Sequence, residues 1–306
     1  MAYYDYSDVK GFLHDEELIR LLCADRTFSE LLEAFAVDDF LALDRSMKVP
    51  FFAEVRDYVG AAERADPRAQ WIVKPISVED ALGPAMGAIC FFLDFFTHTI
   101  SAPTIVTRID GVLYKATRII TRAEQLTGAN YTDIRQLKEQ LVLDLVNRWI
   151  YGDEDRNPNN YMIRYNSRND QIIIAIDFSN VDLLHPGTKI TGNPKSFGWQ
   201  RMEKTRYLTP LKIEHFHGYD MRFFDMRFAG FRSLGKKMLL DLCKACLRFL
   251  PDRVKLSKTV AENILARVDY VHSYFSSMFP REASAEKDDK YSDMGKTFTR
   301  IYKDKR

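Results

Sequence analysis

Two aspartates and an asparagine stand at spacings that suit phosphoryl transfer. Asp155 and Asn160 lie five residues apart in the stretch DEDRNPNN, and Asp177 ends the apolar run IIIAID. A carboxylate can accept or orient the proton of an attacking hydroxyl group, whereas an amide oxygen can ligate magnesium without adding another negative charge. We therefore expect Asp155 to act as the catalytic carboxylate, and Asn160 and Asp177 to be metal ligands.

The segment between Asn160 and Asp177 predicts how these two residues meet. The strand-like runs YMIRY and QIIIAID flank the polar NSRND, which is the pattern of a β-hairpin. Because antiparallel pairing returns the second strand to the start of the first, one divalent ion could contact both residues. A purely structural role is the alternative, since Asp and Asn also bond backbone amides in turns and caps.

A lysine further upstream offers positive charge for the same chemistry. Lys74 lies in WIVKP, where strand alternation places Ile72 and Lys74 on one face. A strand lysine that faces a cleft can contact nucleotide phosphates, so Lys74 is expected to bind the nucleotide and to assist catalysis. The alternative is an edge-strand lysine in solvent, a common protection against sheet aggregation.

The first third of the chain predicts a helical segment followed by a small sheet. Residues 1–45 are acidic with apolar runs at helical spacing, and they predict a helical extension. From Val49 to Ile76 the composition favours two strands, FFAEVRDYVG and WIVKPI. The stretch 101–120 predicts a hairpin with Asp110 and Gly111 at its turn.

The remaining elements are predicted to be mainly helical. Residues 81–100 are apolar at helix length, but Asp94 in their midst favours a buried helix over a membrane span. Tyr131 to Ile150 carries an apolar stripe at helical spacing, and 197–280 is helical in pattern, with Met238–Phe249 and Val260–Phe279 the clearest segments. The tail from residue 281 is charged and poor in apolar residues.

Composition excludes several classes of protein. With 306 residues, 46% of them hydrophobic and 28% charged, the chain can bury a sizeable core. The 44 basic and 43 acidic residues leave a net charge of +1, which argues against a dedicated nucleic-acid binder. Four cysteines are too few for a disulfide scaffold, and the first residues lack a secretion signal, so a cytoplasmic location is expected.

Three blocks of the sequence resemble HipA-like kinase domains. WIVKPI, NRWIYGDEDRNPNNYMI and IIIAIDFS look like the corresponding blocks of that family, with a more distant similarity to phosphoinositide kinases, whose loop often reads DRHPGN. The resemblance covers residues 49 to 280, and its specific part is confined to the three blocks. It implies an α+β, two-lobed protein-kinase-like fold with a small antiparallel-sheet N-lobe and a mainly helical C-lobe, which bind ATP and magnesium between them.

The resemblance also assigns roles to individual residues. Lys74 matches the lysine that contacts phosphates, and Asp155 matches the catalytic aspartate. Asn160 and Asp177 match the asparagine and the aspartate that ligate the metal. The implied domains follow the same division, namely a helical N-terminal extension (1–45), an N-lobe (46–122), a C-lobe with the catalytic loop and metal-binding hairpin (123–280) and a charged tail (281–306).

The implied activity is an ATP- and magnesium-dependent phosphotransferase whose acceptor is a Ser or Thr hydroxyl of a protein. The alternatives are a lipid or small-molecule kinase, for which basic residues between 201 and 258 would face a lipid head group, and a nucleotide-binding pseudokinase that acts as an interaction module. The chain departs from the family pattern at two residues of the motifs, where Asn157 replaces a histidine and Ser179 replaces a glycine. No G-x-G-x-x-G precedes Lys74, and Glu79 is the nearest acid to pair with it.

Overall fold

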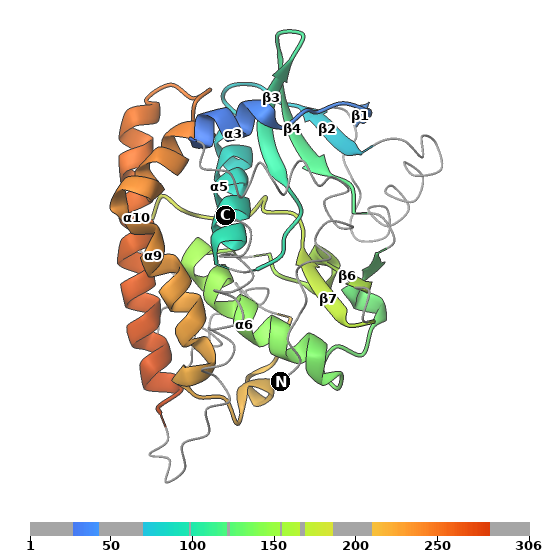
Figure 1. Ribbon diagram of the computed structural model, residues 1–306, viewed down its shortest axis with the longest axis vertical. Helices are drawn as coiled ribbons and strands as arrows, with labels where there is room; N and C mark the ends of the chain where they lie inside the picture. Colours follow the sequence, from blue (N-terminus) through green and yellow to red (C-terminus); the bar gives the residue numbers. More distant parts are fainter. Residues whose placement is uncertain are drawn as a thin grey trace.

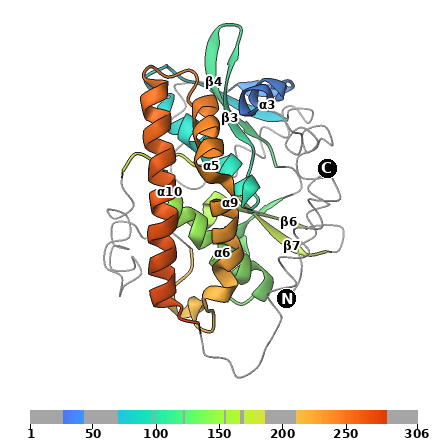
Figure 2. The ribbon, with the colours of Figure 1, turned by 60° about the vertical axis from the view of Figure 1, so that its left-hand side comes forward.

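The computed structural model describes residues 27–42, 70–97, 99–120, 123–153, 155–165, 169–185 and 210–281. These residues form an α+β structure in which the sheets lie on one side and long helices on the other (Figure 1). The helices α9 (Met221–Cys246) and α10 (Arg253–Met278) run side by side along the molecule in both ribbon views (Figure 2). None of the helices in the described ranges is long and apolar enough to cross a membrane.

The larger sheet has the spatial order β1-β2-β4-β3. Its strands have the bounds β1 Phe40–Ala42, β2 Trp71–Pro75, β3 Thr104–Ile109 and β4 Val112–Arg118. The predicted hairpin of β3 and β4 is confirmed, and its turn places Asp110 at φ 48° and Gly111 at φ 83°. Positive φ values cost least for Gly and Asp, which explains why these two residues mark the turn.

Residues 1–45, which were expected to form a helical extension, also contribute a strand. Helix α3 (Phe28–Ala34) begins with a capping box in which Thr27 and Glu30 bond each other's backbone N–H groups. Strand β1 then pairs in parallel with β2, so the sheet is not purely antiparallel. A strand of three residues is too short to show a period in the sequence. The other strand expected in this region, FFAEVRDYVG, lies outside the described residues.

Helix α5 (Leu82–Phe96) packs against the sheet, as the apolar stretch predicts. Trp71 and Val73 of β2 are buried, and the Phe35 ring after α3 makes edge-to-face contacts with Trp71 and Phe91. Aromatic pairs in this geometry add to the free energy gained by burying their area.

Helix α6 (Arg135–Tyr151) leads into the predicted loop and hairpin. It ends at Gly152, whose left-handed backbone (φ 61°) turns the chain into the loop that starts at Asp153. Strands β6 (Tyr161–Tyr165) and β7 (Gln171–Ala175) form the hairpin, and the short strand β5 (Glu124–Gln125) pairs with β6.

The two C-terminal helices are longer than the clearest sequence segments suggest. Helix α9 begins at Met221, where the Asp220 side chain accepts a hydrogen bond from the backbone N–H of Arg222. Gly235 interrupts α9 with a non-helical backbone (φ 62°), so the apolar pattern on its two sides does not read as one helix. Beyond Arg281, the charged tail lies outside the described residues.

Candidate functional site

The hairpin places Asn160 next to Asp177, as its sequence predicts. The backbone N–H of Ile176 donates to the carbonyl oxygen of Asn160 at 3.0 Å. The Arg156 guanidinium reaches both residues, because it donates to the carbonyl oxygen of Asn160 at 3.2 Å and to the carbonyl oxygen of Asp177. The two expected metal ligands are therefore joined through a single buried side chain.

Asp177 occupies an exposed turn and not the buried strand end that the apolar run suggests. Strand β7 ends at Ala175, and Asp177 adopts φ 55° with its side chain 46% exposed. Its Oδ1 atom accepts from the backbone N–H of Ser179 at 3.1 Å and lies 3.5 Å from Lys115 Nζ. Desolvation works to raise the pKa of Asp177, but Lys115, Ser179 and Arg156 outweigh it and hold that pKa below its ordinary value of 3.8.

The carboxylate of Asp155 is held by two asparagine side chains. Asn157 Nδ2 donates to its Oδ1 at 2.8 Å, and Asn180 Nδ2 donates to its Oδ2 at 3.1 Å. Asn157 also accepts from the backbone N–H of Asn159 at 2.8 Å, which fixes the loop at the same point. The residue that replaces the family's histidine thus orients the expected catalytic carboxylate.

Asn160 is placed so that one of its side-chain atoms remains available. Its Nδ2 atom donates to the backbone carbonyl oxygen of Asp155. Within the described residues, no donor bonds its Oδ1 atom. An amide oxygen without a donor and the nearby carboxylate of Asp177 are oxygen ligands of the kind that magnesium prefers. In the described part of the chain, no three His, Cys, Asp or Glu side chains gather as a metal site.

The lysine that contacts Asp177 is Lys115, which the sequence did not single out, whereas the role of Lys74 in binding phosphates stays a prediction. Lys74 of β2 lies directly opposite Lys115 of β4, so both side chains project from the same face of the sheet. Lys74 is exposed and makes no ion pair with any described residue, whereas Lys115 pairs with Asp177. The structure therefore brings Asp155, Asn160 and Asp177 together and places Lys115 closest to them.

No acid of helix α5 pairs with Lys74. Asp94 is the sole acidic residue of that helix, and it is fully buried against Arg148. Glu79 lies in an exposed turn before the helix, and no ion pair joins it to Lys74 in the described ranges. The pairing acid that a kinase-like site would use is thus not supplied by these elements.

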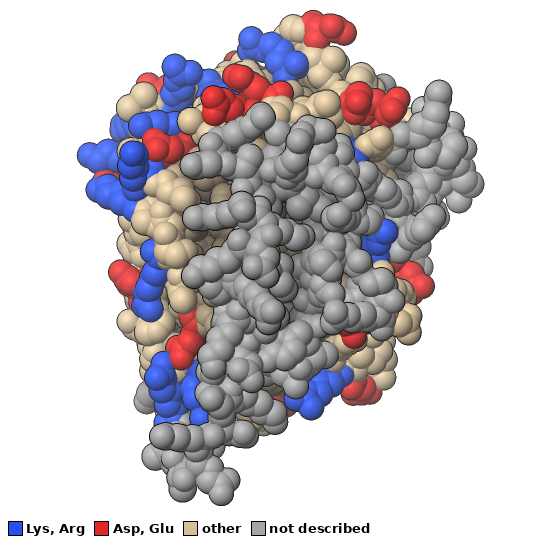
Figure 3. Space-filling model, viewed as in Figure 1, with Lys and Arg blue, Asp and Glu red and all other residues tan. Residues whose placement is uncertain are grey.

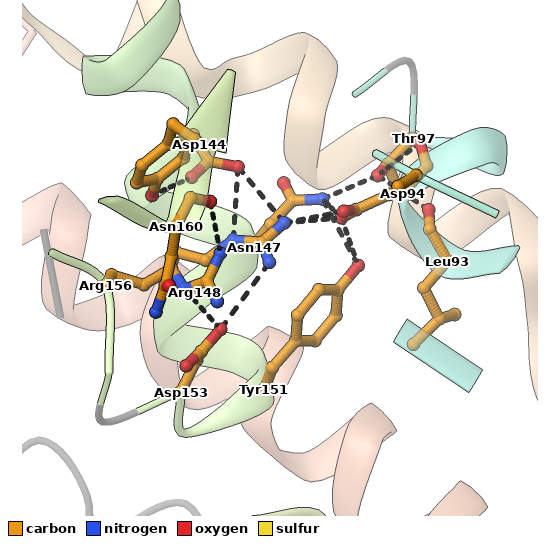
Figure 4. Close-up of polar contacts among 12 residues, drawn as sticks. Leu93, Asp94, Thr97, Asp144, Asn147, Arg148, Tyr151, Asp153, Arg156 and Asn160 are labelled. Carbon is orange, nitrogen blue, oxygen red and sulfur yellow. Dashed lines mark hydrogen bonds and ion pairs between the residues drawn. The ribbon is translucent and has the colours of Figure 1, made fainter. Parts of the chain in front are cut away.

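A buried network of charges underlies the loop (Figure 4). Arg148 of α6 is fully buried and donates to both carboxylate oxygens of Asp94, at 2.8 and 2.7 Å. It also donates to Asp144 at 3.1 Å and lies 3.6 Å from Asp153. Burial would lower the pKa of Arg148, but Asp144 and Asp94 raise it well above its ordinary value, so the guanidinium stays charged.

Phe178 connects this network to Asp177, its neighbour in the chain. The guanidinium carbons of Arg148 and Arg156 lie 5.1 and 5.5 Å from the centre of the Phe178 ring. Gly87 of α5 packs against the same residue so closely that a Cβ atom at Gly87 would lie 3.2 Å from Phe178 Cβ. Helix α5 and the segment at Asp177 are therefore in close contact at Phe178.

The comparisons with known proteins assign no family. No protein-family model matches the chain, and no curated protein matches it. The residues of the site must therefore support any functional conclusion by their own geometry.

The sequence alone did not reveal four residues of the site, which are Lys115, Arg156, Asn157 and Asn180. Lys115 lies near Asp177 because the chain just before β3 pairs with Ala175 at the end of β7 and β3 pairs with β4, and the sequence does not specify the first of these pairings. Asn157 carried a weak signal, because it lies two residues from Asp155 and has a side chain able to bond it, whereas Asn180 bonds Asp155 from 25 residues away and carried none.

Proposed function

We propose that this chain is an ATP- and magnesium-dependent phosphotransferase with a two-lobed, protein-kinase-like arrangement. The observation that carries the proposal is the meeting of Asn160 and Asp177 at one end of the β6–β7 hairpin, beside an oriented Asp155. A carboxylate for the acceptor hydroxyl and two oxygen ligands for magnesium are the parts that this chemistry needs.

The order of the elements supports the same proposal. A strand with a lysine, a buried helix and a hairpin precede helix α6, and the loop of Asp155 and the β6–β7 hairpin follow it. The four-stranded sheet with α5 would form one lobe, and α6, α9 and α10 the other. Lys115 of the sheet contacts Asp177 beside the hairpin, so the nucleotide phosphates would lie where these parts meet.

In this mechanism each residue has a defined task. Asp155 would accept or orient the proton of the acceptor hydroxyl, whose oxygen forms a bond to the γ-phosphorus as the bond to ADP breaks. Asn157 and Asn180 would keep its two oxygens in place. Lys115 and Lys74, on one face of the sheet, would neutralise phosphate charge.

Asn160 Oδ1 and the carboxylate of Asp177 would hold magnesium. When bound, the ion supplies positive charge that offsets the charge developing on the phosphate oxygens. By resemblance, the acceptor is a Ser or Thr hydroxyl of a protein. A cytoplasmic location goes with the proposal, since Cys90, Cys243 and Cys246 are free buried thiols.

Two alternatives differ in what the structure offers them. Basic side chains gather over the α9–α10 turn, at the upper left of Figure 3, around a groove of about 730 Å³. The groove is lined by Leu240, Lys244, Asp252, Arg253, Val254, Lys255 and Lys258. Its basic residues belong to the stretch 201–258 that a lipid kinase would turn toward a head group, but no expected catalytic or metal-binding residue lines the groove, so nothing connects it to the proposed site. Lys74 makes no ion pair within the described residues, which favours the second alternative, a pseudokinase that binds nucleotide without transferring phosphate.

Thermal unfolding with ATP, with and without magnesium, tests the proposal. A ligand that binds the folded state alone at about 100 times its Kd stabilises that state by about 2.7 kcal/mol. We expect ATP with magnesium to raise the unfolding midpoint of the wild type, and Asp177→Asn to lose the part that depends on magnesium. If ATP gives no shift with or without magnesium, the phosphotransferase proposal is wrong.

The low pKa of Asp177 predicts how magnesium-dependent stabilisation responds to pH. Because this pKa lies below 3.8, the carboxylate stays ionised until the pH falls through that depressed value. Lys115→Met removes one cause of the depression, so the pKa of Asp177 will rise and the stabilisation will be lost at a higher pH than in the wild type. Thermal unfolding with magnesium and ATP across a pH series measures this point.

Lys74→Met is the matched control for the pH series. Lys74 projects from the same face as Lys115 but makes no described contact with Asp177. The Lys74→Met variant should therefore lose its magnesium-dependent stabilisation at the same pH as the wild type. If the pH at which the stabilisation is lost shifts equally in Lys115→Met and Lys74→Met, Lys115 does not set the ionisation of Asp177.

A further inference from the structure

Arg156 contacts both expected metal ligands through their backbones. Its side chain is fully buried, and its NH1 and NH2 atoms donate to the carbonyl oxygens of Asn160 and Asp177. Asn160 directly precedes β6 and Asp177 follows β7, so the guanidinium bridges the two chain segments that enter and leave the hairpin. Figure 4 shows the contact between the Arg156 guanidinium and the Asn160 carbonyl oxygen as a dashed line.

The guanidinium is itself held from several directions. Its Nε atom forms an ion pair with Asp153 Oδ2 at 2.8 Å. The rings of Tyr161 and Phe178 lie 5.4 and 5.5 Å from its central carbon. Burial would lower the pKa of Arg156, but Asp153 raises it above its ordinary value, so the group remains charged. A side chain fixed in this way sets the position of the carbonyl groups that it bonds.

Arginine suits this task better than lysine. The guanidinium presents five N–H donors in a rigid plane, so it can serve two carbonyl groups and a carboxylate at the same time. A lysine ammonium carries the same charge as a point, and it cannot reproduce the spacing between two acceptors. The spacing of Asn160 and Asp177 therefore depends on the shape of the side chain as well as on its charge.

We propose that Arg156 is a positioning residue that sets the separation of Asn160 and Asp177 and thereby the contribution of magnesium to nucleotide binding. The inference rests on the proposed function, because it assumes that these two residues hold magnesium. Residues that orient metal ligands without touching the metal commonly change metal affinity about 10- to 100-fold when they are replaced.

Calorimetric titration with ATP tests the inference, at a temperature well below the unfolding midpoint of every variant. The measured quantity is the ratio of the ATP Kd in a metal chelator to the ATP Kd in magnesium. We expect Arg156→Lys to lower this ratio about tenfold, while the Kd in the chelator stays near the wild-type value. Asp153→Asn, which removes the charged anchor of Arg156 but keeps the guanidinium, should lower the ratio by a smaller factor.

Arg267→Met is the matched control. Arg267 of α10 is also fully buried and also donates to backbone carbonyl oxygens, among them that of Ile150 at 3.0 Å, but it contacts neither Asn160 nor Asp177. A merely structural arginine lowers the unfolding midpoint and leaves the ratio of the two Kd values unchanged, which is the result expected for this control.

The possible outcomes separate this inference from the proposed function. If the wild type binds ATP equally well in magnesium and in the chelator, the proposed function fails first. Suppose that ATP binding by the wild type depends on magnesium. If a folded Arg156→Lys or Asp153→Asn variant then has the same ratio of Kd values as the wild type, Arg156 does not have the positioning role. A lowered ratio in Arg267→Met as well would also overturn it, because the effect would then not be specific to the site.

Discussion

On the proposed mechanism, we expect Asp155→Ala to lower phosphoryl transfer about 10²- to 10⁴-fold and to leave ATP binding intact. The carboxylate of Asp155 is held at both oxygens by Asn157 and Asn180, so its direction is fixed before any acceptor arrives. A positioned acid or base contributes about 10²- to 10⁴-fold to a rate, and we expect a loss of that size. Transfer of labelled γ-phosphate to protein acceptors measures the rate, and calorimetry measures the Kd of ATP.

Asp133→Ala is the control for this measurement. Asp133 is an exposed aspartate before helix α6 that accepts from Asn130 Nδ2 at 2.7 Å, and no described hydrogen bond joins its side chain to the loop of Asp155. Its variant should transfer phosphate at the wild-type rate. Wild-type transfer by Asp155→Ala would remove Asp155 from the mechanism. Binding of ATP without transfer by the wild-type protein would favour the pseudokinase.

The second large effect concerns stability. Arg148→Met leaves the carboxylates of Asp94, Asp144 and Asp153 in the interior without their shared positive charge. Removing one partner of a buried ion pair costs about 3–5 kcal/mol, because the remaining charge is then buried and uncompensated. We expect the free energy of unfolding of Arg148→Met to fall by about that amount, as measured by urea denaturation.

Arg135→Met on the same helix provides the comparison. Arg135 is 70% exposed and donates to Glu139 at 2.7 Å, which is as short as the shorter Arg148–Asp94 bond and shorter than the Arg148–Asp144 bond. Because the Arg135 end of this pair lies in water, although Glu139 is buried, screening limits its contribution to about 0–1 kcal/mol. Equal losses in the two variants would contradict the view that burial, and not the ion-pair distance, decides the cost.

Elements with local signals could be predicted from the sequence. The two hairpins follow from alternating apolar residues around polar turns, and α5 and α6 follow from their apolar spacing. The juxtaposition of Asn160 with Asp177 follows directly from the β6–β7 hairpin, since its pairing is local. The roles of these residues in phosphoryl transfer remain predictions.

Contacts between distant segments could not be predicted in the same way. The parallel pairing of β1 with β2 and the contact of Lys115 with Asp177 both depend on how segments far apart in the sequence align. The bonds of Arg156 go to backbone carbonyl groups, which every residue possesses, so no side-chain pattern marks them. The exposure of Asp177 depends on where β7 stops, and strand ends are poorly specified by composition.

The position of α3 also bears on how the chain is made. This early helix packs against α9, and the ring of Phe28 just within it meets Phe92 and Phe96 of α5. Ribosomes add about 5–20 residues per second, so α3 leaves the ribosome roughly 10–40 s before α9 does. The part of α3 that packs against α9 must wait that long for its partner, so this part of the core can close only after α9 has been made.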